Sequence, residues 1–322
     1  MIVEIEGGTA TKLYLEGLQK FRVFGRKEHS RNGPVIAMPG PTLMTLLDPR
    51  KRVLDDPIRN ANPFFHAMEF VWMMAGRLDV KWIAQFNKQM EAYADDGIIS
   101  AAYGYRWRYH YGKDQIQTVI DMLRSDPGTR QAVLQMWDPD MDLGEQKKDK
   151  ACNTEILFRT LNGALDMTVI NRSNDFVWGA VGANICHMTM LHETVAHYSG
   201  IPLGKYMVFS NNMHIYENMP RYAEISQQIV ANEVYNRQNI EWMHGETDSY
   251  QGFVQDCEYF CSDHQGRVTH PWLLRTARPI YDAWMEHKAG DAYAAGETIA
   301  LCTSDDWRTA CTNWLQRKYE TS

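Results

Sequence analysis

Two runs of branched and aromatic residues, TEILFRTL and ALDMTVINRS, flank the dipeptide Asn162-Gly163, and they restrict the possible folds more than any other feature. Strand-forming runs joined by Asn-Gly predict a β-hairpin, because both residues tolerate the positive φ angles of a two-residue turn. The runs RQAVLQMW and KYMVFSN predict further strands on either side of this hairpin. We therefore expect one sizeable sheet built from these segments.

Helical periodicity surrounds the expected strands. Four segments show it: PFFHAMEFVWMMAGR, the stretch from Val80 to Tyr93, KDQIQTVIDMLRSDPGTR, and ANICHMTMLHETVAHYSG with glycine just past its end. The chain is again helical from about residue 270 onward. The order of helices and strands predicts an α+β fold in which helices flank one large mixed sheet. We expect a catalytic core over residues 1–235 and a mostly helical C-terminal extension over residues 236–322.

Composition excludes several classes of protein. The 322 residues are 44% hydrophobic, enough for a large core, and the net charge of −7 argues against wrapping a nucleic-acid polymer. No apolar run approaches ~18 residues, so we expect no membrane span. The first residues lack the pattern of a signal peptide, and six cysteines in a chain of this length predict reduced thiols. A cytoplasmic location, in a bacterium or an infected host cell, is therefore expected.

Two histidine or cysteine groupings resemble metal sites without meeting their requirements. His192 and His197 in HETVAH are five residues apart, whereas a zinc-binding helix places its histidines four apart on one face. Cys257, Cys261 and His264 offer three ligands, but no second cluster completes a tetrahedral site. We expect no metal, and the signature of zinc deaminases is also absent.

A thiol occupies an unusual place in KKDKACNTEILF, where a lysine-rich run meets the expected strand. Cys152 is therefore a candidate nucleophile, although a structural thiol is the commoner case. Arg172, Ser173 and Asp175 follow at the end of the next strand. His214 and Tyr216 share one face of an extended segment, because alternate residues of a strand point the same way. Glu69 lies in an apolar helix, and a buried carboxylate is costly unless it is paired or protonated.

These residues resemble the motifs of the thymidylate synthase family. The resemblance covers roughly residues 20–235 and rests on several motifs in order: Glu69 in MEFVWMMAG, YG at 103–104, DPGTR at 126–130, AC at 151–152, RSND at 172–175 and HIY at 214–216. It implies an enzyme that alkylates C5 of a pyrimidine nucleoside 5′-monophosphate, with 5,10-methylenetetrahydrofolate as cofactor. A homodimer is also implied.

The resemblance further implies a role for each matching residue. Cys152 would add to C6 of the pyrimidine, with its pKa lowered by nearby arginines, Glu69 would relay protons, and Tyr103 would assist removal of the C5 proton. Asp175 would contact the pterin ring. The substrate-binding residues would be Arg31, Arg172 and Ser173 at the phosphate, Arg130 reaching the phosphate from the partner subunit, His214 and Tyr216 at the sugar, and Asn184 at the base.

Structural alternatives remain for several of these residues. Arg172 and Asp175 could form an ion pair at a strand end, and Tyr103 or His214 could be ordinary core residues. Arg26 competes with Arg31 for the phosphate, because SRNGPV is a loose match to the family's phosphate loop. The segment GAVGAN before Asn184 is one residue longer than the family's usual spacing.

Departures from the family pattern cluster around the folate and the base. NKQMEAYADDG lacks the family's tryptophan pair, Gln131 follows Arg130 where a second arginine is usual, and Asn153 follows the cysteine in place of histidine. This pattern favours an enzyme that still alkylates C5 but completes the reaction differently, with water instead of hydride adding to the exocyclic methylene. We expect a nucleotide hydroxymethylase, with dUMP slightly favoured over dCMP or CMP. A true thymidylate synthase, or a catalytically silent nucleotide- or RNA-binding homologue, is the alternative.

Overall fold

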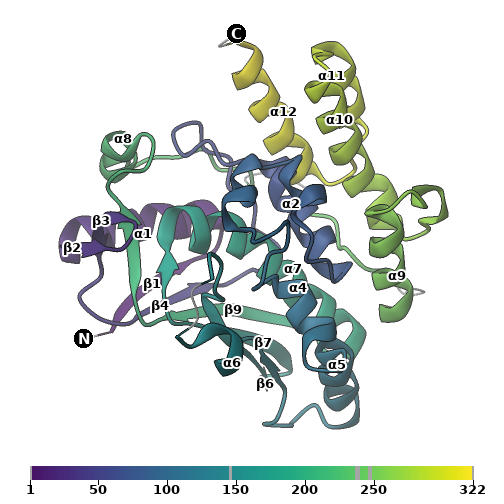
Figure 1. Cartoon of the computed structure of the whole chain (residues 1–322), viewed down its shortest axis with the longest axis horizontal. Coiled ribbons are helices and arrows are strands. Elements are labelled where there is room, and N and C mark those ends of the chain that lie inside the picture. The colour runs from purple at the N-terminus through teal and green to yellow at the C-terminus, as the bar shows by residue number, and fades with distance from the viewer. Residues whose placement is uncertain (1, 145–146, 236–239, 246–248, 321–322) are drawn as a thin grey trace.

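The structure is a computed structural model that describes residues 2–144, 147–235, 240–245 and 249–320. Within these ranges ten strands form two sheets, with helices above the larger one (Figure 1). The strands are β1 Val3–Gly7, β2 Arg26–Ser30, β3 Gly33–Ala37, β4 Thr42–Leu46, β5 Val133–Gln135, β6 Asn153–Leu161, β7 Ala164–Asn171, β8 Asn174–Asp175, β9 Leu203–Ser210 and β10 Met213–Tyr216.

Helices make up much of the remaining described chain. The α-helices are α1 Ala10–Phe24, α2 Pro63–Met74, α3 Val80–Ala84, α4 Tyr103–Tyr105, α5 Gln115–Ser125, α6 Pro139–Asp142, α7 Asn184–Ser199, α8 Tyr222–Gln227, α9 Tyr250–Phe260, α10 Arg278–Lys288, α11 Ala292–Ala300 and α12 Asp305–Glu320. Short 3₁₀ or π segments are η1 Lys88–Tyr93, η2 Arg106–His110, η3 Phe176–Ala183, η4 Gln265–Arg267 and η5 Leu273–Ala277. None of the helices in these ranges is long and apolar enough to cross a membrane.

The large sheet has the strand order β1-β4-β9-β7-β6-β5 and is mixed, as predicted. β6 and β7 form the expected antiparallel hairpin, with Leu161 opposite Ala164. Asn162 and Gly163 between them have φ angles of 52° and 79°, the backbone of a two-residue hairpin turn. β7 pairs in parallel with β9, so the chain crosses over through α7, which packs above the sheet.

A second sheet, with the order β2-β3-β10-β8, was not predicted from the sequence. Its strands are short: β8 has two residues and β10 four. β8 pairs in parallel with β10, with Asp175 opposite His214. This small sheet brings segments around residues 31, 175 and 214 to the end of the large sheet.

Helix α2 forms the centre of the core, and every one of its residues is buried, including Glu69. Asn62 caps its first turn by accepting a hydrogen bond from the Phe65 N–H. Helix α7 is also almost wholly buried and ends at Gly200, whose φ of 73° is the left-handed conformation typical of a helix C-terminus. Both helices were predicted from the sequence.

The predicted helix from Val80 to Tyr93 is wrong in one respect, because it is broken in two. α3 ends at Ala84, and η1 begins at Lys88. Asn87 between them has extended backbone angles, and its side chain caps η1 by accepting from the Gln89 N–H. A local cap therefore overrides the helical pattern of apolar residues.

The C-terminal helices α9, α10 and α12 pack against α2, and α11 packs against α10 and α12 (Figure 1). The rings of Trp284 on α10 and Trp314 on α12 both contact Phe64, with ring centroids 5.5 Å apart in each pair. These helices share the hydrophobic core with the rest of the chain. The division into two parts at residue 235 stays a prediction.

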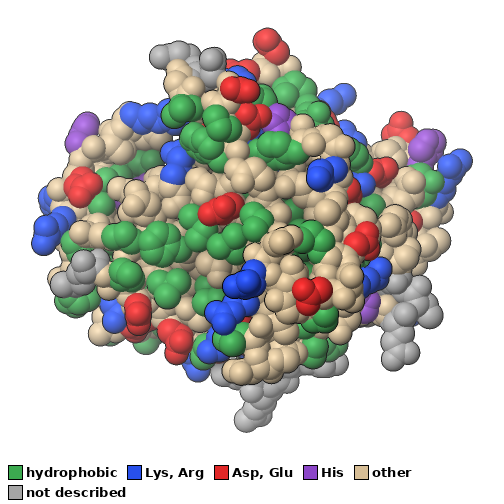
Figure 2. Space-filling model, turned by 90° about the horizontal axis from the view of Figure 1, so that it is seen from below, with side chains coloured by type: hydrophobic (Ala, Val, Ile, Leu, Met, Phe, Trp, Pro, Cys, Tyr) green, Lys and Arg blue, Asp and Glu red, His purple; other side chains and the backbone are tan. Residues whose placement is uncertain are grey.

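The face of the large sheet that points away from the helices is partly apolar. Adjacent strands place Leu43, Phe209 and Ile170 in one cross-strand row, and each is half-buried. In the view from below, hydrophobic side chains gather in a band across the middle of the molecule (Figure 2). An apolar sheet face of this kind is typical of a protein–protein contact.

Candidate active site

Cys152 lies immediately before β6, opposite the end of β7, as the sequence predicted. Its carbonyl accepts a hydrogen bond from the backbone N–H of Arg172 at 3.0 Å. The Arg172 guanidinium turns back across the same junction: Nε donates to the Ala151 carbonyl at 2.9 Å, and Nη2 lies 4.0 Å from the Cys152 sulfur. Two neighbouring strand ends thus bring a thiol and a guanidinium together.

Cys152 is the one cysteine of the chain that is not buried, and all six are free thiols. The expectation that arginines lower its pKa is only partly met. Arg172 and Arg31 act in that direction, but burial, with Asp149 and Asp175 nearby, outweighs them and raises the pKa of Cys152 above its usual value. Without a bound substrate the sulfur is therefore held as a thiol.

Glu69 has a partner that the sequence did not reveal. Its Oε2 lies 3.1 Å from Nδ1 of His187 on α7, a residue that is 1% exposed. The His187 ring also packs edge-on against Tyr103, with ring centroids 5.8 Å apart. The buried carboxylate is thus explained by a histidine 118 positions away along the chain.

Tyr103 stands between the Glu69–His187 pair and the thiol. Burial, with the nearby Cys152 and Asp149, raises the pKa of Tyr103 well above its usual value. At neutral pH its phenol therefore keeps its proton and acts as a hydrogen-bonding group rather than as a phenolate. The alternative that Tyr103 is an ordinary core residue is weakened by its half-buried position beside the thiol.

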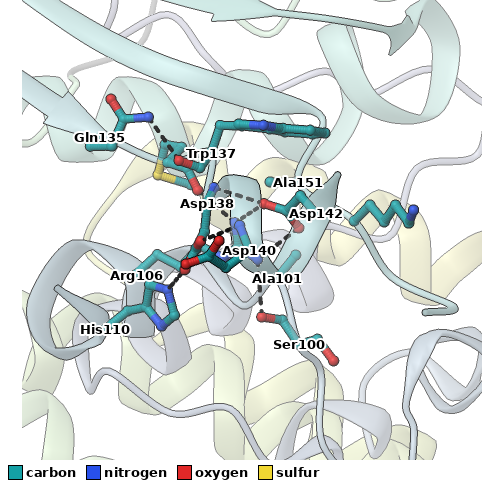
Figure 3. A network of polar contacts seen from close by, with 12 residues as sticks. Ser100, Ala101, Arg106, His110, Gln135, Trp137, Asp138, Asp140, Asp142 and Ala151 are labelled. Carbon is teal, nitrogen blue, oxygen red and sulfur yellow. Dashed lines mark hydrogen bonds and ion pairs between the residues drawn. The ribbon is translucent and has the colours of Figure 1, made fainter. Parts of the chain in front are cut away.

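A buried ion pair supports the segment that carries Tyr103. Arg106 donates two hydrogen bonds to the carboxylate of Asp142 and further ones to the carbonyls of Met136 and Ser100. Figure 3 shows Asp138 and His110 joined to the same network. Arg106 is fully buried and its guanidinium is engaged by these groups, so its role is to fix the backbone around the site.

Asp175 occupies the start of η3 and accepts hydrogen bonds from the N–H groups of Val177 and Trp178 at 2.9 and 3.1 Å. Burial outweighs these bonds and raises the pKa of Asp175 to about 6. The cation that lowers its pKa is Arg59, whose guanidinium stacks on the Trp178 ring at 4.3 Å. The suggested ion pair between Arg172 and Asp175 is therefore wrong, since Arg172 binds backbone carbonyls instead.

His214 and Tyr216 share one face of β10, as predicted, with ring centroids 4.9 Å apart. Nδ1 of His214 lies 2.9 Å from the side-chain oxygen of Asn212, and burial lowers the pKa of His214. The Tyr216 hydroxyl accepts a hydrogen bond from Asn32 in the turn between β2 and β3. Arg31, also in this turn, is exposed and close enough to influence the pKa of Cys152.

Asn184 begins α7, and its Nδ2 lies 3.5 Å from the side-chain oxygen of Asn174. Ser173 lies between Arg172 and Asn174 and is half-buried. Asn153, directly after the nucleophile, is 1% exposed, and neither amide atom has a partner among the residues that the structure describes. An unsatisfied amide beside a candidate nucleophile is typical of a position that meets a ligand.

Arg130 is not part of this assembly. It is exposed in the turn before β5, and β5 pairs with β6 so that Val133 faces Leu157. Arg130 and Cys152 thus lie near opposite ends of the β5–β6 pair, roughly 20 Å or more apart at ~3.3 Å per strand residue. Within one subunit it does not reach a phosphate held by Arg172.

The metal-like groupings have structural explanations. Nε2 of His192 lies 2.6 Å from the Leu165 carbonyl, and Cys257 and Cys261 are buried. No group of three or more potential metal ligands occurs in the part of the chain that the structure covers.

Four residues near the site were missed by sequence reasoning: Arg59, Tyr93, Asp149 and His187. Tyr93 lies in η1 with 52% of its surface exposed, and its pKa is raised by burial and by Asp149, Asp175, Tyr216 and Cys152 nearby. The segment NKQMEAYADDG was noted only for its lack of tryptophan. Tyr93 itself, as an aromatic residue of that segment, was the feature of the sequence that could have indicated this part of the site.

An accessible thiol among arginines and carboxylates in an α+β fold is typical of enzymes with a nucleophilic cysteine. A sequence model described as thymidylate synthase matches residues 59–258. The chain belongs to the thymidylate synthase family, and the prediction of a one-carbon transferase of this family is confirmed.

Three curated relatives come from phages, and each is named deoxyuridylate hydroxymethyltransferase. The protein of Pseudomonas phage M6 is 37% identical over 321 residues, which cover 94% of this chain and 91% of the relative. Those of Bacillus phage SP01 and Delftia phage PhiW-14 are 33% and 31% identical and align with 65% of this chain. These two alignments cover 58% and 61% of the relatives.

Proposed function

We propose that this enzyme hydroxymethylates C5 of a pyrimidine nucleoside 5′-monophosphate, with dUMP preferred over dCMP and CMP. The observation that carries the proposal is the thiol of Cys152 at a strand end, with the Arg172 guanidinium beside it and Tyr103 behind it. The names of the three phage relatives favour dUMP and the hydroxymethyl product. As expected for an enzyme with phage relatives, we place it in the cytoplasm of a bacterium or an infected host cell.

Cys152 activates the pyrimidine by adding to C6. C5 of a pyrimidine is a weak nucleophile until a thiolate adds to C6 and places an enolate across C5 and C4. Because the resting sulfur is protonated, its proton leaves as the C–S bond forms, and Arg172 and Arg31 stabilise the negative charge. Glu69, paired with His187, moves protons at the base carbonyl, while the phenol of Tyr103 holds a water that receives the C5 proton.

The cofactor proposed is 5,10-methylenetetrahydrofolate, which supplies the one-carbon unit when bound. The residues around Asp175 fit a flat heteroaromatic ring. Its carboxylate accepts a hydrogen bond from the backbone N–H of Trp178 and lies near Tyr93, and both of these rings are half-exposed; a carboxylate close to accessible aromatic rings suits a ring with N–H donors. Asp175 would orient that ring, and Tyr93 would cover it.

The remaining polar residues bind the nucleotide. Arg172, Ser173 and Arg31 hold the 5′-phosphate, since guanidinium groups give charge-assisted hydrogen bonds to phosphate oxygens. His214 and Tyr216 contact the sugar. Asn184 meets the edge of the base, because an amide offers both a donor and an acceptor to uracil.

The functional unit proposed is a homodimer. The apolar outer face of the large sheet, with Leu43, Ile170 and Phe209 in one row, offers the contact surface. With a two-fold axis on this face, Arg130 of one subunit would reach the phosphate bound in the other subunit's site. Within one subunit, Arg130 lies too far from the phosphate site.

Mass spectrometry of the products tests the proposal. The enzyme is incubated with methylenetetrahydrofolate and dUMP, dCMP or CMP in turn. A gain of one CH2O unit, greatest with dUMP, is expected. A gain of CH2 with formation of dihydrofolate would make the chain a methylating synthase, and nucleotide binding with no product would make it the silent homologue.

A further inference from the structure

One carboxylate next to the nucleophile has no part in the chemistry described so far. Asp149 precedes Cys152 by three residues and is half-buried. Its Oδ2 accepts a hydrogen bond from the backbone N–H of Ala101, two residues before Tyr103, at 3.2 Å. This bond ties the loop that carries the nucleophile to the segment that carries the site's phenol.

The loop on both sides of Asp149 is held in place. Lys148 donates to the Ala94 carbonyl at 2.8 Å and pairs with Asp95 at 3.5 Å. On the other side, Arg172 donates to the carbonyls of Lys150 and Ala151. Since neighbouring cations are engaged elsewhere, Asp149 forms no ion pair with any residue of the described ranges, and its Oδ1 has no hydrogen-bond partner among them.

The surroundings of Asp149 favour proton transfer. Burial raises the pKa of this carboxyl, and Asp142 adds to the effect, while Arg106 and Arg172 oppose it. A carboxylate with a raised pKa is a stronger base than one in free solution. Tyr93, which is close enough to Asp149 and Cys152 to be influenced by both, is half-exposed, so this side of the site is accessible to solvent.

The other candidate bases of the site are engaged. Glu69 is paired with buried His187, and Asp175 accepts two backbone hydrogen bonds through one oxygen and serves the proposed pterin contact. Tyr103 keeps its proton.

We propose that Asp149 is the general base for the water that ends the reaction, an inference that rests on the proposed function. After tetrahydrofolate has left, the pyrimidine carries C6 bonded to Cys152 and a methylene double-bonded to C5. A water oxygen bonds to the methylene carbon, and its proton passes to the Asp149 carboxylate. The electron pair moves through C5 to the C4 carbonyl, then returns to form C5=C6 as the C6–S bond breaks. No oxidant or reductant is needed.

The first experiment separates this step from those that precede it. In a single turnover, with enzyme in excess over dUMP tritiated at C5, wild-type enzyme should release tritium and form hydroxymethyl product at similar rates. Asp149→Asn should keep tritium release within about threefold, yet lose product formation by about 10²-fold, the usual size of a general-base effect. Added 2-mercaptoethanol should then capture the methylene as a thioether of the nucleotide. Asp96→Asn, at an exposed position with a φ of 49° near the same loop, is the matched control and should behave as wild type.

The second experiment needs no folate. Cys152 can add to C6 of 5-hydroxymethyl-dUMP, after which the hydroxymethyl group can lose water to form the methylene. When water adds back in H₂¹⁸O, the hydroxymethyl oxygen becomes labelled. Wild type should exchange it, and Asp149→Asn should exchange it at least ~30-fold more slowly while binding the nucleotide with unchanged affinity. Asp149→Ser is the second variant if the first is poorly folded.

The outcomes are distinguishable. Undiminished product formation or oxygen exchange by a folded Asp149 variant overturns the inference, as does an equal loss of tritium release and product. By contrast, a wild-type enzyme that releases no tritium from C5 contradicts the proposed function itself.

Discussion

Folding buries the carboxylate of Asp175, and the free-energy cost of its charge in the folded state can be tested quantitatively. Asp175→Asn removes the charge but keeps an oxygen that can accept from the N–H groups of Val177 and Trp178. The pKa of Asp175 rises from 3.8 to about 6 on folding. At ~1.4 kcal/mol for each pH unit, ionised Asp175 destabilises the folded state by about 3 kcal/mol, an upper value because the side chain is partly open to solvent.

The sign of the effect follows from proton binding. Between pH 3.8 and about 6, the folded state holds a proton that the unfolded state has released, so wild type loses stability as pH rises through this window. Asp175→Asn does not, so its advantage in free energy of unfolding should grow from near zero at pH 4 to about 2–3 kcal/mol at pH 7.5.

Urea unfolding at pH 4, 5, 6 and 7.5, followed by tryptophan fluorescence, measures this difference. Asp96→Asn changes an exposed turn residue and should leave the pH dependence unaltered. A variant that is less stable than wild type at pH 7.5, or whose advantage is the same at every pH, would refute the reasoning. The variant should also lose activity, because the proposed pterin contact uses the negative charge of Asp175.

Three further perturbations test the site and one tests the fold. Cys152→Ala should abolish tritium release from C5 of dUMP while leaving nucleotide affinity measurable by calorimetry. Mixing that variant with Arg130→Ala should restore activity in about a quarter of the sites. Half of the dimers formed are mixed, and in each mixed dimer one site combines an intact Cys152 with an intact Arg130 from the other subunit. No recovery would show that Arg130 does not enter the partner's site. Asn184→Asp should shift kcat/KM from dUMP toward dCMP, and an unchanged preference would contradict its role at the base. Gly104→Ala should lower stability by about 3 kcal/mol or more in thermal unfolding, since its Cβ would lie 1.8 Å from the carbonyl oxygen of Met73.

Local signals in the sequence were sufficient for the main elements. The Asn162-Gly163 turn, the apolar run of α2 and the glycine after α7 act over a few residues, so their structures follow from backbone preferences and hydrophobic periodicity. The helix expected from Val80 to Tyr93 shows the limit of such signals. There the cap at Asn87 competes with the periodic pattern and prevails.

Sequence by itself determined the family, the hairpin that places Cys152 opposite Arg172, and the order of the motifs along the chain. Tertiary structure alone decided which charges meet. His187 reaches Glu69 from 118 residues away, Arg59 approaches Asp175, and Asp149 accepts a hydrogen bond from the Ala101 N–H. The physical reason is that pKa values and ion pairs depend on burial and on distances of a few ångströms between segments remote in the chain, and neither quantity is encoded in local residue patterns.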